Sequence, residues 1–261
     1  MTELEQAQEA LRKTHEELER RVADEMEIAQ QVQRKLFPQK TPLLETLDYA
    51  GACVPARAVG GDYYDFLKLG SGRLGLVLAD IVGKGIAAAL LMANLQANLR
   101  SQCVIALDNL LGLLQSVNRA LFESTEASHY ATLFFADYED ATRRLRYANC
   151  GHNPPLLLRG NATLERLPAT ATVLGMFEDW ESSIGAVQLA PGDTLVVFTD
   201  GVTEALSDAG EEFGETRLIE TLRAHRDLSV DTLLITLAST VQQFSGSEQE
   251  DDLTLLVARA R

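Results

Sequence analysis

Acidic residues recur where apolar, strand-like runs begin or end. Asp80 follows the run LGLVLA, Asp200 follows LVVFT, Asp251 and Asp252 precede LTLLVA, and Asp62 follows two glycines. Carboxylates gathered at strand ends repel one another strongly unless a cation lies among them. Hard divalent cations such as Mg²⁺ and Mn²⁺ prefer oxygen ligands of this kind. The pattern therefore predicts a metal-dependent enzyme.

A set of strand-end acids can hold two metal ions about 3.5–4 Å apart with a water molecule bridging them. Such a water is acidified and acts as a nucleophile near neutral pH, while the cations neutralise charge on a transferring phosphoryl group. Each acid taken alone also fits a solvated turn or a helix cap. The prediction therefore depends on the whole set.

Other catalytic arrangements fit poorly. The sequence has no GxSxG elbow, no SxxK motif and no GxxxxGK[ST] phosphate loop. His152 stands in the segment CGHNPP, where a structural turn role competes with a catalytic one and is favoured. Lys84 and Arg57 are candidate contacts for an anionic substrate, although plain solvation is the simpler explanation for each.

Composition narrows the function classes further. The chain has 261 residues, 46% hydrophobic residues and a net charge of −15. This charge argues against nucleic acid as a partner and against docking to anionic lipid. The longest apolar run in a helical context, residues 86–93, is too short to span a bilayer, so no membrane insertion is expected. The three cysteines are widely spaced, and the N-terminus is densely charged, which predicts a reduced, cytoplasmic location.

Residues 1–37 differ in composition from the rest, being rich in Glu, Gln, Arg and Ala and free of Gly and Pro. A heptad register places Leu4, Leu11, Leu18, Glu25 and Val32 at one core position, and Gln8, His15, Val22, Ala29 and Leu36 at the other. The pattern predicts a coiled-coil linker that makes a homodimer through residues 1–37, although its seam contains polar residues. A single helix lying on the domain is the alternative.

Residues 45–261 predict one α+β domain. Hairpins are expected over residues 63–81, 130–149, 156–167 and 181–199, with helices over 85–101, 109–124, 213–224 and 230–244. Many antiparallel strands with helices in two separate pairs indicate a β-sandwich of two antiparallel sheets flanked by helices.

Five ordered motifs carry a resemblance to a known family. They are VGGDYYDF at 59–66, ADIVGKG at 79–85, YANCGHNPP at 147–155, FTDGVTE at 198–204 and DDLT at 251–254. The combination resembles the SpoIIE/RsbU branch of the metal-dependent protein phosphatases, which are similar to protein phosphatase type 2C. Residues 28–38 resemble the helix that enters this domain, so the likeness runs from about residue 28 to the C-terminus.

The resemblance implies a sandwich with a two-metal site, holding Mn²⁺ or Mg²⁺, at one edge. It implies hydrolysis of phosphoserine or phosphothreonine on a protein, and the branch typically acts on STAS-type anti-sigma-factor antagonists in partner switching. It also implies regulation through the N-terminal helix by an upstream sensor domain. The chain begins inside the heptad pattern, and the sequence leaves open whether it is a fragment of a longer receptor.

The resemblance assigns the site residue by residue. Asp80 would bridge both metals, and the Ile81 carbonyl would bind one of them. Asp200 and Asp251 would complete one metal's shell, and Asp62 would serve the other. Asp80 and Asp200 would act in catalysis through the metal-bound water.

Further residues take supporting roles in this assignment. Asp252 and Gly201 are the supporting or alternative ligands, and Arg57, Lys84 and His152 are the candidate substrate contacts. Eukaryotic relatives have Gly-His after the bridging acid where this chain has Ile81 and Val82, so leaving-group protonation must come from metal-bound water or elsewhere. Two alternative hypotheses for the function are a catalytically silent scaffold with the same fold and an enzyme that acts on small phosphoesters.

Overall fold

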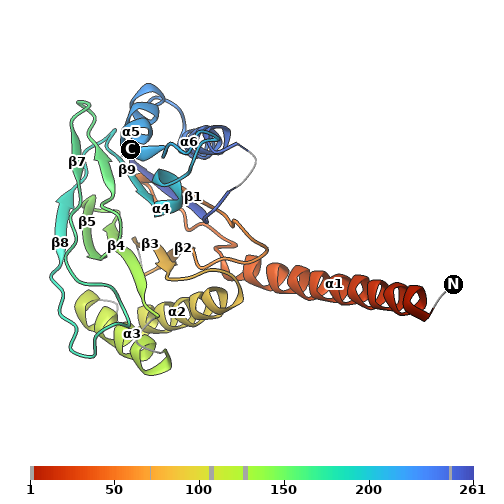
Figure 1. Cartoon of the computed structure of the whole chain (residues 1–261). Coiled ribbons are helices and arrows are strands. Elements are labelled where there is room, and N and C mark those ends of the chain that lie inside the picture. The colour runs from red at the N-terminus through yellow and green to blue at the C-terminus, as the bar shows by residue number, and fades with distance from the viewer. Residues whose placement is uncertain (1–2, 71, 106–108, 126–128, 247–248) are drawn as a thin grey trace.

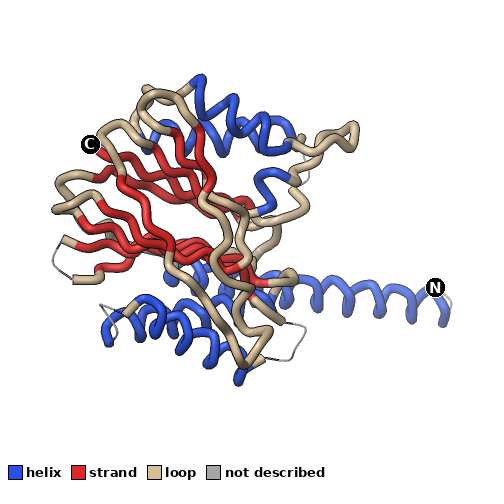
Figure 2. Tube along the Cα trace, turned by 90° about the vertical axis from the view of Figure 1, so that its left-hand side faces the viewer, coloured by secondary structure: helices blue, strands red, loops and turns tan. Residues whose placement is uncertain are grey.

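Two five-stranded antiparallel sheets lie face to face, and helices cover both outer surfaces (Figures 1 and 2). The computed structural model describes residues 3–70, 72–105, 109–125, 129–246 and 249–261. The first sheet contains, in spatial order, β1 (Leu47–Val54), β10 (Leu253–Ala260), β9 (Thr194–Phe198), β6 (Leu156–Leu158) and β7 (Leu164–Arg166). The second contains β2 (Tyr63–Lys68), β3 (Arg73–Ile81), β4 (Ala131–Glu139), β5 (Arg144–Cys150) and β8 (Gly185–Gln188).

Successive side chains of β3 point to opposite faces of the second sheet, so this one strand contributes to two hydrophobic cores. Leu74, Leu76 and Leu78 are fully buried in the core between the two sheets. Val77 and Ala79 point to the opposite face and join the core beneath the helices. A strand buried on both faces reads as a continuous apolar run, as this one does.

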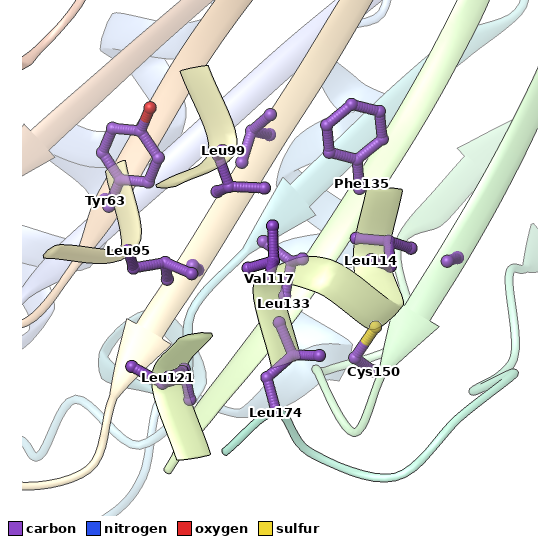
Figure 3. Close-up of a cluster of buried hydrophobic side chains, with 14 of the residues drawn as sticks. Tyr63, Leu95, Leu99, Leu114, Val117, Leu121, Leu133, Phe135, Cys150 and Leu174 are labelled. Carbon is purple, nitrogen blue, oxygen red and sulfur yellow. The ribbon is translucent and has the colours of Figure 1, made fainter. Parts of the chain in front are cut away.

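Helices cover each sheet on its outer side. Helices α2 (Ile86–Ile105) and α3 (Leu110–Ser124) pack on the second sheet, where Leu95 and Leu99 meet Leu114 and Val117 (Figure 3). Helices α5 (Gly214–Ala224) and α6 (Val230–Phe244) pack on the first sheet. Burial of these apolar faces provides the main driving force for the layered arrangement.

Helix α1 (Glu3–Leu36) projects away from this sandwich (Figure 1). Its C-terminal end packs on the domain through Leu36 and the following Phe37. Leu4, Leu11 and Leu18 of the predicted seam are 57–72% exposed on the projecting part. Among the described residues, no helix is long and apolar enough to cross a membrane.

The predicted fold class is confirmed, and the hairpins β2–β3, β4–β5 and β6–β7 form as expected. The fourth predicted hairpin is wrong. Strand β8 pairs with β5 in the second sheet, while β9 pairs with β10 and β6 in the first. The turn at Pro191, Gly192 and Asp193 therefore carries the chain from one sheet to the other, because a local turn signal does not determine which sheet the next strand joins.

Candidate active site

Asp80 lies near the end of β3, where it is paired with Thr132 of β4. The strand continues through Asp80 to Ile81, where the predicted hairpin over residues 63–81 also ends. Asp80 has the same parity as Leu76 and Leu78, so its side chain points toward the other sheet. Its carboxylate is therefore placed at the edge of the space between the two sheets.

Asp200 lies directly across this edge. It follows β9 and begins the short helix α4 (Asp200–Thr203), which the sequence did not predict. A Cβ atom on Gly201 would lie 2.1 Å from the carbonyl oxygen of Asp252, so only glycine permits this approach. The backbone N–H of Thr199 also donates to the carbonyl of Thr254 at 3.1 Å. The end of β9 and the start of β10 therefore bring Asp200 and Asp251 to one place.

Asp62 reaches the same edge from the loop before β2. Its side chain is only 3% exposed, and its Oδ2 accepts a hydrogen bond from Thr199 Oγ1 at 2.8 Å. Thr199 belongs to the other sheet's edge, so this bond joins the two halves of the site. A Cβ on Gly61 would lie 2.8 Å from the Ile81 carbonyl oxygen, so the glycine lets the loop approach that carbonyl closely.

Asp252 supports this loop rather than facing the open edge. Its Oδ1 accepts from the N–H of Ala56 at 2.9 Å, and its Oδ2 accepts from the N–H of Asp62 at 3.3 Å. The side chain is 8% exposed. Two adjacent acids thus have different surroundings, because Asp251 is half-buried and Asp252 is buried against backbone donors.

The carboxylates act on one another electrostatically. Burial, with the negative charges of Asp200 and Asp251 adding to it, raises the pKa of Asp80 to about 7. Burial, followed by the charges of Asp80 and Asp252, raises the pKa of Asp62 well above its usual range. Burial and the charge of Asp251 raise the pKa of Asp200. Acids that destabilise one another's charged forms in this way form a site for a cation.

The donors fit a hard divalent cation, since the converging groups are carboxylate and carbonyl oxygens with a net negative charge. Among the described residues, however, no three His, Cys, Asp or Glu side chains have the spacing of a metal site. Several carboxylates make other contacts instead. Lys84 Nζ lies 3.0 Å from Asp251 Oδ2, and Thr199 binds Asp62. The set of metal ligands therefore remains a prediction. The structure shows only that the predicted ligands come from elements that meet at one edge of the sandwich.

Basic residues lie at the mouth of this region. Arg57 is exposed, and its guanidinium lies beside Gly85 at the turn before α2. Lys84 also donates to the Glu250 carbonyl at 2.8 Å. A cavity of about 140 Å³ is lined in part by Lys84, Gly201 and Asp251, so it borders one of the proposed ligands. Lys84 is therefore placed to meet an anion that enters this cavity.

His152 does not fit the role of substrate contact. Its side chain is 5% exposed, so a phosphoprotein cannot reach it from solvent. Its Nδ1 lies 2.8 Å from Thr132 Oγ1, and the backbone N–H of His152 donates to Asn149 Oδ1 at 2.8 Å. The structural alternative weighed for CGHNPP is the one that agrees with this burial.

Two residues of the site were missed by sequence reasoning. Thr199 binds Asp62, and Gln33 of α1 is 6% exposed and hydrogen-bonds to the backbone of Gly60. Thr199 stands directly before Asp200 in the motif, which was a usable signal. Gln33 had no signal beyond its place in residues 28–38, because its partner lies 27 residues away.

The sequence model of the family described as Stage II sporulation protein E (SpoIIE) matches residues 70–261, which is most of the chain. The phosphoserine phosphatase RsbU of Bacillus subtilis is 31% identical over 94% of this chain and 72% of its own length. The chain belongs to the SpoIIE family. This membership confirms the prediction that the chain belongs to the SpoIIE/RsbU branch of the metal-dependent protein phosphatases. It also confirms the predicted enzyme class, which is protein serine/threonine phosphatase.

Other proteins are similar to this chain over most of its length. Protein IcfG of Synechocystis is 30% identical over 89% of this chain, and the chain spans only 41% of IcfG. The RsbU and RsbW domains of a Mycobacterium tuberculosis protein superpose with a TM-score of 0.73 at 26% identity, over 85% of this chain and 62% of that one. The SiaA-PP2C domain of Pseudomonas aeruginosa superposes with a TM-score of 0.80 at 20% identity, over 93% and 98% of the two chains, which shows the shared fold.

Proposed function

We propose that this chain hydrolyses phosphoserine or phosphothreonine on a protein, using two divalent cations, Mn²⁺ or Mg²⁺. The ligands would be Asp62, Asp80, the Ile81 carbonyl, Asp200 and Asp251. The observation that carries the proposal is the convergence of acids from both sheets on one edge, where burial and neighbouring negative charges raise the pKa values of Asp62, Asp80 and Asp200. When bound, the cations would supply an activated water nucleophile and neutralise charge on the phosphoryl group.

The remaining residues of the site position these ligands. Asp252 fixes the loop that carries Asp62 through the N–H groups of Ala56 and Asp62. Thr199 orients the Asp62 carboxylate by donating to its Oδ2. Such supporting hydrogen bonds set the orientation and basicity of metal-binding groups.

Arg57 and Lys84 are the groups we assign to the substrate phosphate. Arg57 offers an exposed guanidinium, whose planar fork suits phosphate oxygens. Lys84 would exchange its contact with Asp251 for a phosphate oxygen when a cation neutralises that carboxylate. Ile81 and Val82 have no side-chain proton to give, so neither serves as general acid.

A phosphorylated protein is the substrate class that we propose. The similarity to RsbU, which is named a phosphoserine phosphatase, supports phosphoserine as the group that is hydrolysed. The resemblance of the five motifs to the SpoIIE/RsbU branch is the basis for proposing a STAS-domain protein as the partner that carries it.

Helix α1 is the proposed regulatory element. It projects from the domain with Leu4, Leu11 and Leu18 exposed, and its inner end contacts the Asp62 loop through Gln33 and Gly60. Pairing of two chains through residues 1–37, under the control of an upstream sensor domain, would therefore act directly on the proposed site.

The substrate class is tested by comparing three substrates in the presence of Mn²⁺. They are a STAS-domain protein phosphorylated on serine, the same protein phosphorylated on tyrosine, and p-nitrophenyl phosphate. We expect the highest kcat/KM for the phosphoserine protein. Turnover of p-nitrophenyl phosphate alone would indicate a small-phosphoester enzyme. Mn²⁺ binding without any turnover would indicate a domain that awaits its activating signal, and the absence of both Mn²⁺ binding and turnover would indicate a scaffold.

A further inference from the structure

The helix-facing side of the second sheet carries a group of charged residues at the end of the strands away from Asp80. Val77, Phe135 and Ala148 lie on this side of the sheet and belong to the hydrophobic core beneath helices α2 and α3. Side chains two or four residues along the same strands share that face. On the side remote from Asp80 these positions are charged, and they are Arg73 on β3, Asp137 and Glu139 on β4, and Arg144 and Arg146 on β5.

These residues form two adjacent rows across the sheet. Arg73, Glu139 and Arg144 are cross-strand partners in one row. Asp137 and Arg146 are partners in the next row. A cavity of about 240 Å³ is lined by these five residues, which we call the arginine patch. Its lining has three positive and two negative side chains, in a chain whose net charge is −15.

Both carboxylates of the arginine patch are engaged by neighbouring side chains. Asp137 is 4% exposed and accepts from Arg73 Nη2 at 2.7 Å and from Arg146 Nε at 3.1 Å. Glu139 accepts a hydrogen bond from the Thr142 hydroxyl in the turn between β4 and β5. Asp137 therefore holds two guanidinium groups in fixed positions, which lowers the entropy that they would lose on binding an anion.

Arg144 adds a guanidinium group that no other side chain uses. It is exposed, and within the described part of the chain its side chain makes no hydrogen bond or ion pair, since only its backbone N–H contacts Thr142. The planar fork of an arginine binds a carboxylate through two parallel N–H bonds. An unpaired arginine beside two ordered ones at a cavity thus favours an anionic partner.

We propose that the arginine patch docks an extended, acidic segment of a partner protein. Arg144 and Arg146 are two residues apart on one strand, so their Cα atoms lie about 7 Å apart and their side chains share a face. An extended segment presents alternate side chains at the same spacing, so acids at alternate positions meet both arginines. Arg73 is seven residues from Asp80 along β3, roughly 23 Å, so this docking is separate from the proposed hydrolysis.

The test measures fluorescence anisotropy of a labelled peptide of alternating aspartate and threonine, titrated with the full chain. An isomer with all its aspartates at one end has the same charge and checks the spacing. The variant is Arg144→Gln, and the matched control is Arg223→Gln, which changes the net charge equally. Arg223 is also exposed and has no side-chain partner within the described part of the chain, but it lies on α5 at the first sheet.

We expect saturable binding of the alternating peptide, about tenfold weaker in Arg144→Gln because a charged hydrogen-bonding group is lost. Arg146→Lys should also weaken binding, since it keeps a charge beside Asp137 but removes the planar fork. Arg223→Gln should leave the affinity unchanged, and the grouped isomer should bind more weakly than the alternating peptide.

Equal losses in Arg144→Gln and Arg223→Gln, or equal affinity for the two isomers, would overturn the proposal and indicate non-specific charge attraction. Binding of inorganic phosphate without binding of the alternating peptide would also overturn it, because the patch would then take only a small oxyanion. Absence of peptide binding would do the same. None of these outcomes depends on phosphatase activity, so the docking surface and the proposed function are tested separately.

Discussion

The side-chain amide of Gln33 pairs with the backbone of Gly60 through two hydrogen bonds, from Nε2 to the carbonyl at 2.7 Å and from the N–H to Oε1 at 3.1 Å. Gly60 stands two residues before Asp62, so this pair fastens the projecting helix to the loop that carries a proposed metal ligand. A rotation or shift of α1 would therefore move Asp62 relative to Asp80.

Gln33→Ala should impair the site through this contact. It leaves the buried N–H and carbonyl of Gly60 unpaired, which costs about 1–3 kcal/mol of unfolding free energy, and we expect weaker Mn²⁺ binding and slower turnover. The control is Gln31→Ala, because Gln31 is exposed and its side chain donates only to Glu27. Mn²⁺ titration of the two variants checks the prediction, and equal effects would contradict it.

Leu11→Glu with Leu18→Glu should abolish self-association. Both side chains are exposed in the structure and occupy the predicted seam, where a charge opposes pairing. Analytical ultracentrifugation of the variant and of a chain lacking residues 1–30 should show monomers where the full chain is a dimer, with altered phosphatase activity. An unchanged oligomeric state and unchanged activity would reject the regulatory role of the helix.

Lys84→Met should separate metal binding from substrate binding. Removing the ammonium that lies 3.0 Å from Asp251 frees that carboxylate, so Mn²⁺ affinity should rise. Loss of the proposed phosphate contact should raise KM for the phosphoprotein. Lys84→Arg, which keeps the charge, should change both constants less. Weaker Mn²⁺ binding in Lys84→Met would contradict the assigned competition.

The metal-free protein should lose stability as pH rises from about 4 to 7. The pKa of Asp80 is raised from 3.8 to about 7, so in this window the folded state binds more protons than the unfolded state. The free energy of unfolding then falls with rising pH, by about 1–4 kcal/mol from this group. Above pH 7 this contribution is fully lost, and a bound cation should restore it.

Urea unfolding at pH 5, 6 and 7, with EDTA and then with Mn²⁺, measures this effect. Asp80→Asn should flatten the decline in the metal-free protein, which isolates the contribution of this one carboxyl group. The prediction would be contradicted if, in EDTA, the free energy of unfolding of the wild type rose from pH 5 to 7 and rose by the same amount in Asp80→Asn.

The layered fold was predictable because local patterns determine it. The alternation in β3 and the polar turn between β4 and β5 each specify a strand or hairpin without knowledge of the rest of the chain. The order of strands was not fully predictable, since the turn before β9 reads as a hairpin and in fact changes sheets. Pairing between distant strands depends on which apolar faces fit together.

The same distinction applies to the site. Asp80 and Asp200 could be named as candidate ligands because each follows an apolar run and precedes a turn that contains glycine. Gln33 and the support that Asp252 gives to Asp62 depend on contacts 27 and 190 residues apart. His152 was recognised as unusual, but the sequence reveals neither its burial nor its contact with Thr132.

The central claim is that carboxylates at the sandwich edge make this chain a metal-dependent protein phosphatase. The most direct measurement is phosphate release from a phosphoserine STAS-domain protein across a Mn²⁺ titration, for the wild type, Asp200→Asn and Asp208→Asn, whose exposed carboxyl lies outside the proposed ligand set. We predict Mn²⁺-dependent turnover in the wild type and in Asp208→Asn, with a loss of at least about a hundredfold in Asp200→Asn. Turnover that does not depend on Mn²⁺, or turnover in Asp200→Asn at the wild-type rate, would contradict the claim.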